Sequence, residues 1–301
     1  MGTLRSPPAD RSVDELLSFG VVNLDKPPGP SAHQVSAWAR DLAGVERAAH
    51  AGTLDPKVTG CLPILLDDAT RLAQVFLEGT KEYVAVLELH GPAPTDLDAV
   101  LDAFEGEIYQ KPPRKSAVAR RLRTREIHAL DLLEVRERQA LIRIRCESGT
   151  YVRKLCHDIG LAAGTGAHMG DLRRTATDPF DDTDLVSTAD LTDALTFADE
   201  GDEAPLRDVV APAERALTHL PRLTVAVSAA EQIAEGAPVY APGIVDVGPD
   251  VAALDEASES SSDAPLVACF TPDGSAVCLG HLTGDPRAES GEAVSLERVL
   301  V

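Results

Sequence analysis

The sequence predicts an α+β fold, with a mixed, mainly antiparallel sheet in a large first domain and a small β-rich second domain. The 301 residues leave room for about two domains, each with a sizeable core. Strand and helix patterns alternate irregularly in the first part of the chain, without the regular repeats of a parallel sheet. After about residue 220 the pattern changes to short strands with one helix between them.

The N-terminal part of the chain contains an arm, a strand and a helix. Residues 1–19 are polar and contain prolines, and we expect this arm to pack on the second domain. A short apolar strand follows from Gly20 and ends in a turn rich in proline and glycine. Ser31 is a favourable N-cap for the next helix, which ends at Gly44. One face of this helix carries three apolar side chains, those of Val35, Trp38 and Leu42.

The remainder of the first domain, to about residue 210, alternates further strands and helices. Apolar or alternating patterns predict strands at 60–66, 83–90, 127–135 and 140–147. Helical spacing predicts helices at 70–77, between Asp96 and Gly106, and towards the end of 149–160. The basic segment 110–117 contains prolines that favour an extended path. A polar, acidic connection is expected at 199–208.

Residues 211–301 hold a connecting helix, near 211–220, and the β-rich domain, whose core we place at about 222–300. Strands are predicted at 223–227, 266–270 and 276–280, with a hairpin turn from Pro272 to Gly274 between the last two. A helix at 228–235 ends at Gly236. The acidic, serine-rich stretch 246–264 predicts a mobile loop.

The formal net charge of −21 is concentrated in the second part of the chain. Residues 1–180 carry 23 basic and 25 acidic residues, whereas residues 181–301 carry 5 and 24. Residues 111–125 contain seven basic residues and no acidic one. With 22 arginines to 6 lysines and abundant acids, the chain looks adapted to high salt, where Coulomb attraction is screened. Acidity therefore does not exclude an RNA partner, but it predicts local contacts made by arginine side chains.

The cysteines and the apolar segments restrict the class of protein. Five cysteines form no CxxC pair, which argues against a zinc site and predicts reduced thiols in a cytoplasmic protein. No run of about 18 apolar residues occurs, so we expect no membrane span. The N-terminal segment lacks the apolar centre of a signal peptide.

The stretch from His50 to Pro56, with the sequence HAGTLDP, places the carboxylate of Asp55 in a short polar turn. Pro56 biases Asp55 away from helical geometry, and Gly52 permits backbone angles that other residues avoid. Considered alone, such a turn is typical of a structural aspartate.

Other polar candidates also have ordinary explanations when each is taken alone. Arg153, near the start of a helix, could be a surface residue, and Tyr83 could be a half-buried strand aromatic. His50 and His168 are more often structural hydrogen-bonding residues than catalysts. The basic run at 111–125 could be a solvated face.

Six segments in order are much harder to explain separately: LDKPPG (24–29), HAGTLDPKVTGCLPI (50–64), KEY (81–83), QKPPRKSA (110–117), GTYVRKLCHDIG (149–160) and GAHMGDLRRT (166–175). Together they resemble the TruB/dyskerin family of RNA pseudouridine synthases. The C-terminal part resembles a PUA domain, an RNA-binding module. The longer segments YQKPPRKSAV, RCESGTYVRKLCHDIG and ERALTHLP are most similar to the archaeal catalytic subunit of box H/ACA guide ribonucleoproteins.

The resemblance implies that residues 20–210 form the catalytic domain. It implies that Asp55 is the nucleophile or base, that Arg153 pairs with it, and that Tyr83 stacks on the flipped uracil and takes part in proton transfer. Breaking the N1–C1′ bond, turning the uracil and joining C5 to C1′ involves neither redox chemistry nor hydrolysis. We therefore expect no cofactor and no metal. Leu172 would form an apolar wall of the pocket. His50 and Lys26 would help to hold the RNA near it.

The resemblance also implies partners. These are a box H/ACA guide RNA, an rRNA or tRNA substrate, small Nop-type and Gar-type subunits and a kink-turn-binding ribosomal-type protein. Two other functions stay open at this point. One is a stand-alone tRNA pseudouridine synthase acting on the T-loop uridine, and the other is a non-catalytic RNA-binding scaffold. The presence of Asp55, Tyr83 and Arg153 together argues against the scaffold.

Overall fold

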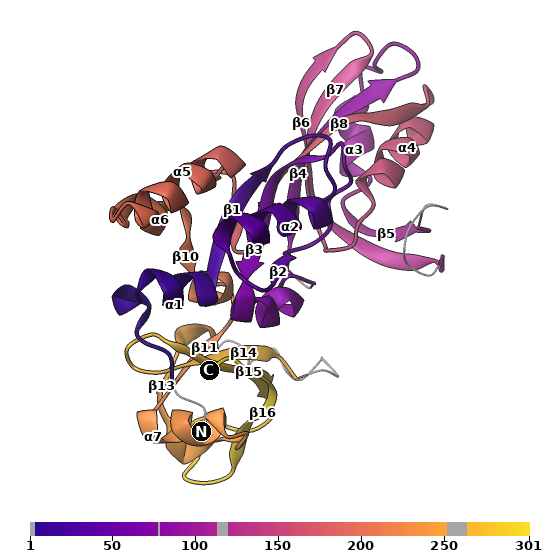
Figure 1. Cartoon of the computed structure of the whole chain (residues 1–301). Coiled ribbons are helices and arrows are strands. Elements are labelled where there is room, and N and C mark those ends of the chain that lie inside the picture. The colour runs from indigo at the N-terminus through magenta and orange to yellow at the C-terminus, as the bar shows by residue number, and fades with distance from the viewer. Residues whose placement is uncertain (1–3, 78, 113–119, 252–263) are drawn as a thin grey trace.

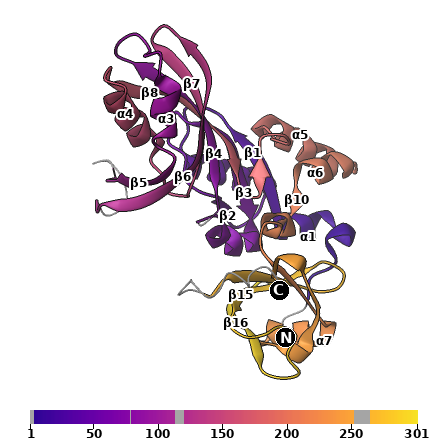
Figure 2. The same cartoon turned by 180° about the vertical axis from the view of Figure 1, so that it is seen from behind.

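The computed structural model describes residues 4–77, 79–112, 120–251 and 264–301. A larger part with a long twisted sheet lies above a smaller part built from the C-terminal strands (Figures 1 and 2). Most strand pairs are antiparallel, but β3 runs parallel to β8 and β11 runs parallel to β14. The predicted α+β class with a mixed, mainly antiparallel sheet is confirmed.

The sheet of the larger part follows the order β10-β1-β3-β8-β4-β7-β6-β5, with β2 paired to β3 and β9 to β8. Its strands are β1 (Gly20–Lys26), β2 (Ala48–His50), β3 (Thr59–Leu66), β4 (Lys81–Leu89), β5 (Gly106–Gln110), β6 (Arg123–Arg136), β7 (Gln139–Cys146), β8 (Ala167–Thr177), β9 (Phe180–Asp181) and β10 (Ala211–Pro212). The sequence did not predict β8, although it lies in the middle of the sheet. Its residues, AHMGDLRRTAT, lack apolar alternation because several polar side chains face its neighbours rather than water.

Helices cover the sheet: α1 (Val13–Ser18), α2 (Ala32–Ala43), α3 (Leu97–Asp102), α4 (Val152–Ala162), α5 (Thr188–Asp199) and α6 (Ala204–Val209), with 3-10 turns η1 (Pro8–Asp10), η2 (Asp67–Leu77) and η3 (Ala213–Leu217). Two predicted helices were wrong in type: residues 70–77 belong to the 3-10 turn η2, and the connecting segment near 211–220 holds β10 and the 3-10 turn η3, since Pro212 disfavours helical geometry before it. Three other helices were not predicted. The N-terminal arm contains α1, which begins at a capping box formed by Ser12 and Glu15. The polar connection contains α6, and the unpredicted α5 begins at a capping box of Ser187 and Asp190.

Helix α2 begins and ends as predicted, but only part of its apolar face is buried. Ser31 accepts from the backbone of Gln34 in a capping box. Val35 is fully buried beside small alanines, whereas Trp38 and Leu42 are 45% and 39% exposed. Small side chains bring α2 close to the sheet, so the larger pair remains at the rim of the contact.

The smaller part holds a six-stranded sheet in the order β12-β16-β15-β14-β11-β13. The strands are β11 (Arg222–Val225), β12 (Val239–Tyr240), β13 (Ile244–Val247), β14 (Leu266–Phe270), β15 (Ala276–Leu282) and β16 (Glu292–Val299), with α7 (Val227–Ala234) and the 3-10 turn η4 (Ala241–Gly243). The stretch predicted as an acidic loop, 246–264, begins inside β13, and its residues 252–263 lie outside the described residues. The predicted hairpin between β14 and β15 is present.

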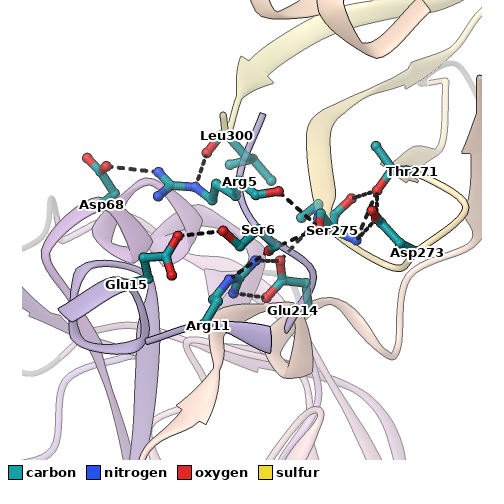
Figure 3. Close-up of polar contacts among 11 residues, drawn as sticks. Arg5, Ser6, Arg11, Glu15, Asp68, Glu214, Thr271, Asp273, Ser275 and Leu300 are labelled. Atoms are coloured by element: carbon teal, nitrogen blue, oxygen red, sulfur yellow. Dashed lines mark hydrogen bonds and ion pairs between the residues drawn. The ribbon is translucent and has the colours of Figure 1, made fainter. Parts of the chain in front are cut away.

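The N-terminal arm lies between the two parts and binds both (Figure 3). Arg5 donates to the backbone oxygen of Leu300 at 2.9 Å and to the Asp68 carboxylate at 2.8 Å. Arg11 and Glu214 form a bidentate pair at 2.8 and 2.6 Å, and both side chains are almost fully buried. The same carboxylate accepts from the backbone N–H of Ala276, at the start of β15, at 3.1 Å. One ion pair thus joins the arm, the connecting segment and the C-terminal sheet.

Breaking this pair from one side is expected to destabilise the chain strongly. Glu214→Gln leaves the buried Arg11 without its counter-charge, which costs about 3–5 kcal/mol for buried pairs. The measurement is denaturant unfolding at high salt, followed by circular dichroism. Asp41→Asn is the control, because it breaks an Arg–Asp pair that is mostly exposed, and we expect it to have almost no effect. Equal stability of the two variants would contradict the role of the buried pair.

Candidate active site

The loop at 51–58, between β2 and β3, presents Asp55 at the surface with its side chain 55% exposed. Gly52 adopts a φ of +92°, a left-handed conformation that disfavours other residues. The backbone N–H of Val58 donates to the backbone oxygen of Asp55 at 3.0 Å and closes the turn. The Pro56 oxygen accepts from the backbone of Gly29 at 2.8 Å, which fixes the loop against the turn after β1.

Lys26 holds this loop from inside the protein. Its side chain is fully buried, and Nζ donates to the backbone oxygens of Pro27, Pro56 and Val58 at 3.0, 3.0 and 2.8 Å. Burial lowers the pKa of the Lys26 ammonium group, and the charge of Asp55 opposes that shift. The structure therefore places Lys26 beneath the loop, and its predicted contact with RNA stays a prediction.

Arg153 reaches Asp55 from the first turn of α4, and the two side chains form an ion pair. The start of α4 is itself fixed by Gln110, at the end of β5. The buried amide of Gln110 accepts from the backbone N–H of Tyr151 at 2.8 Å and donates to its oxygen at 3.3 Å. Sequence reasoning gave Gln110 no role, because a reciprocal contact with a helix start 41 residues away leaves no local signal.

Tyr83 and Leu172 lie on neighbouring strands and on one face of the sheet. The register pairs Tyr83 of β4 with Arg174 of β8, and Ala85 with Leu172. Tyr83 and Leu172 are partly buried, and both pack against the hydrophobic clusters on either side of β4 and β8. Burial raises the pKa of the Tyr83 hydroxyl, while the charge and a hydrogen bond of Arg174 lower it.

Arg174 is the residue of this site that sequence reasoning missed. Its side chain is 1% exposed, and Nε donates to the Cys61 oxygen at 2.7 Å. The neighbouring Arg173 points the other way and pairs with Asp25 at 3.0 Å. Two adjacent arginines in a strand must face opposite sides, but only knowledge that 167–177 is a strand could reveal this.

His50 ends β2 beside the loop, and its half-buried ring stands edge-on to His33, with the ring centroids 6.0 Å apart. Nδ1 of His50 is buried without a hydrogen-bond partner among the described residues. Burial lowers the pKa of His50, and the charges of His33 and Arg174 add to this. His168 lies apart and shares a 3.0 Å hydrogen bond with His90.

Comparison with known proteins identifies the family. Residues 40–96 and 90–152 match the TruB family pseudouridylate synthase N-terminal domain, and residues 153–218 match the C-terminal domain of tRNA pseudouridylate synthase B. Residues 4–36 match the DKCLD (NUC011) domain. The "Probable tRNA pseudouridine synthase B" of Haloarcula marismortui is 64% identical over 99% of this chain and 94% of its own length. The chain belongs to the TruB family. It is accordingly an RNA pseudouridine synthase, an isomerase.

Other TruB relatives and solved structures cover almost the whole chain. The protein of the same name from Halobacterium salinarum is 65% identical over 99% of both chains. A chain from a "Cbf5-Nop10-Gar1 Complex" is 41% identical, with a TM-score of 0.90 over 100% of this chain and 91% of that one. A chain from an "H/ACA RNP bound to a substrate RNA containing 2'-deoxyuridine" is 39% identical, with a TM-score of 0.88 over 99% and 90%. These likenesses support the division into a catalytic part and a PUA domain.

The side chains of Asp55 and Arg153 are each 55% exposed, so the carboxylate is accessible from solvent. A cavity of about 340 Å³ lies elsewhere, between β4, β8 and β9, and none of the predicted site residues lines it.

Across the described ranges, no three His, Cys, Asp or Glu side chains are grouped so that they could hold a metal ion. The five cysteines are free and buried. No helix within the described part of the chain is long and apolar enough to cross a membrane.

Lys81 begins β4, two residues before Tyr83, and is almost fully buried. Its Nζ donates to the backbone oxygens of Phe76 and Gly79 at 2.9 and 2.7 Å. Burial, with a smaller effect from the charge of Arg174, lowers the pKa of Lys81 from 10.5 to about 8. A lysine with this pKa loses its proton far more easily in the folded chain than in the unfolded one.

The lowered pKa of Lys81 predicts how stability depends on pH. Between about pH 8 and 10.5 the unfolded chain binds more protons at this residue, so its contribution to the free energy of unfolding rises with pH. Lys81→Met should remove this rise, and the exposed Lys57→Met should keep it. Denaturant unfolding at pH 7.5, 9 and 10 measures the difference. A slope in Lys81→Met equal to that of the wild type would refute the assignment.

Proposed function

We propose that this enzyme is the catalytic subunit of a box H/ACA guide ribonucleoprotein that isomerises specific uridines of ribosomal RNA, with tRNA as a second substrate class. The observation that supports this most is the likeness, over the whole chain at a TM-score of 0.90, to a chain of a Cbf5-Nop10-Gar1 complex. A second neighbour belongs to an H/ACA RNP bound to a substrate RNA.

In this proposal Asp55 supplies the carboxylate that starts the reaction. It attacks C1′ of the ribose or removes the proton from C2′, and the N1–C1′ bond breaks. The uracil turns and C5 joins C1′, which breaks the bond from Asp55 to C1′ in the first route or is accompanied by return of the proton to C2′ in the second. The proton lost from C5 is balanced by one gained at N1. Arg153, paired with Asp55, orients the carboxylate toward the reacting ribose.

Tyr83 would stack on the flipped uracil and take part in the transfer of the proton from C5. Its partly buried position beside Leu172 fits that role, because Leu172 would close the pocket with an apolar wall. His50 and Lys26 would help to hold the RNA. Of these, Lys26 acts through the loop, since its ammonium group faces three backbone oxygens.

The end of β5 and the chain that follows it offer groups that RNA binds. Tyr109, near the end of β5, is 70% exposed, and Lys111, Arg120 and Arg121 are exposed on the chain that follows. Exposed aromatic and basic side chains bind single-stranded RNA through stacking and phosphate contacts. Part of the predicted basic segment, residues 113–119, lies outside the described residues.

The same neighbours support Nop-type and Gar-type subunits, and the other proposed partners rest on the sequence resemblance alone. We expect Nop-type and Gar-type subunits, a kink-turn-binding ribosomal-type protein, and a guide RNA held by the PUA domain. The alternative, a stand-alone enzyme for the T-loop uridine of tRNA, is favoured by the names of the similar proteins, which read "tRNA pseudouridine synthase B". The cytoplasmic location stays a prediction.

Asp55→Asn is expected to abolish the release of tritium from a target uridine labelled at C5, because an amide can neither attack C1′ nor remove the C2′ proton. Binding of RNA, measured by filter retention, should persist. Asp131→Asn is the matched control, since Asp131 also pairs with an arginine at a largely exposed position. Release at a wild-type rate from Asp55→Asn would sink the nucleophile assignment.

The two substrate hypotheses differ in their need for a guide. At high salt, with the small subunits added, release from an rRNA target should require a matching guide RNA. A guide with a scrambled pairing sequence is the control. Full activity of the chain alone on free tRNA, without a guide or a partner, would favour the stand-alone enzyme.

A further inference from the structure

We propose that Arg174 is a positioning residue of the pseudouridine synthase reaction, which fixes the Asp55 loop and Tyr83 relative to each other. This inference rests on the assignment of Asp55 and Tyr83 to the reaction. It adds a residue that touches neither the sugar nor the base but sets the distance between the groups that do.

Arg174 holds the Asp55 loop on both sides of the carboxylate. Nη2 lies 3.4 Å from the backbone oxygens of Ala51 and Gly52, which precede Asp55. Nε donates at 2.7 Å to the oxygen of Cys61, on β3, which follows the loop. One planar group therefore spans the entry and the exit of the loop, which a lysine ammonium, as a single point of charge, cannot do.

The backbone around Arg174 allows its side chain to reach the loop oxygens. β3 and β8 are parallel neighbours at Gly60 and Arg174, and a Cβ on Gly60 would lie 2.2 Å from the Arg174 oxygen. A Cβ on Gly52 would lie 3.3 Å from Nη1 of the guanidinium. Glycine at both places lets the loop and the strand approach until the side chain of Arg174 reaches the loop oxygens.

The same guanidinium reaches Tyr83. The two residues are cross-strand partners on β4 and β8, and the guanidinium of Arg174 lowers the pKa of the Tyr83 hydroxyl that burial raises. Tyr83 is thus tied to the loop of Asp55 through one rigid group. The position of the phenol relative to the loop therefore depends on where this side chain lies.

The charge of Arg174 is not neutralised within the site. No carboxylate in the described part of the chain lies within 4 Å of its guanidinium, and its acceptors are neutral oxygens. A buried cation without a counter-charge favours negative charge beside it. Its effect on Tyr83 has that sign, because the guanidinium lowers the pKa that burial raises.

The test is single-turnover release of tritium by the assembled enzyme in excess over RNA, which separates rate constant from amplitude. Arg174→Lys should lower the rate constant roughly 100-fold, the size expected for a displacement of about 1 Å, while the amplitude stays complete. Arg173→Lys is the matched control, because Arg173 pairs with Asp25 on the opposite face, and we expect at most about a threefold change.

A merely structural role gives a different result. Loss of folded enzyme leaves the rate constant at saturating excess unchanged, and it lowers the amplitude only when the active enzyme falls below the RNA. Such a result, or a rate constant for Arg174→Lys within about threefold of the wild type, would overturn the proposal. Failure of both Arg174→Lys and Arg174→Gln to fold, by circular dichroism, would also overturn it. Asp55→Asn in the same assay keeps the two proposals apart, because its activity decides the nucleophile assignment whatever Arg174 does.

A spectroscopic measurement reports on the contact with Tyr83 directly. With ¹³C-labelled tyrosine, Arg174→Gln should raise the pKa of the Tyr83 resonance, whereas Arg173→Gln should leave it unchanged. The exposed Tyr109 and Tyr240 serve as internal references. An unchanged Tyr83 titration in Arg174→Gln would refute the link between the two side chains.

Discussion

Two buried cations, Lys26 and Arg174, donate hydrogen bonds to backbone oxygens of the 51–58 loop and of the residues next to it. The position of Asp55 depends on this arrangement. Lys26 takes the oxygens of Pro56 and Val58 after the carboxylate, and Arg174 takes those before it. Buried backbone oxygens need such partners, because leaving them unpaired costs free energy. The loop is therefore held by hydrogen bonds before and after Asp55, although Asp55 itself is at the surface. The role proposed for Asp55, which is to react with a flipped nucleotide, needs this combination of exposure and fixed position.

The rest of the larger part brings three distant segments to that loop. β4 supplies Tyr83, β8 supplies Leu172 and Arg174, and the first turn of α4 supplies Arg153. Each lies on a regular element rather than on a flexible connection. Gln110 extends this support to the start of α4, so the helix cannot rotate Arg153 away from Asp55 without breaking two hydrogen bonds.

The electrostatic contacts divide according to burial, which matters for an acidic protein at high salt. The Arg11–Glu214 pair and the cations beneath the loop are buried, so dissolved ions screen them little. Many of the exposed pairs, such as Arg40–Asp41, are accessible to dissolved ions, which screen them, so they contribute little to stability. The contact between the catalytic part and the PUA domain thus combines these buried polar contacts of the N-terminal arm with a shared hydrophobic cluster, in which Phe76 of the larger part and Phe270 and Leu300 of the smaller part are buried.

The sequence by itself determined the features that local chemistry controls. Ser31 begins a helix and Tyr83 lies on a strand, since each of these depends on nearby residues. The ordered motifs also led to Asp55 and Arg153, which the structure joins in an ion pair. Tertiary structure alone decided that β8 lies in the middle of the sheet, that Lys26 is buried, and that Arg174 rather than Arg173 faces the loop. The physical reason is register: a strand turns alternate side chains to opposite faces, and only pairing with distant strands fixes which face is the site.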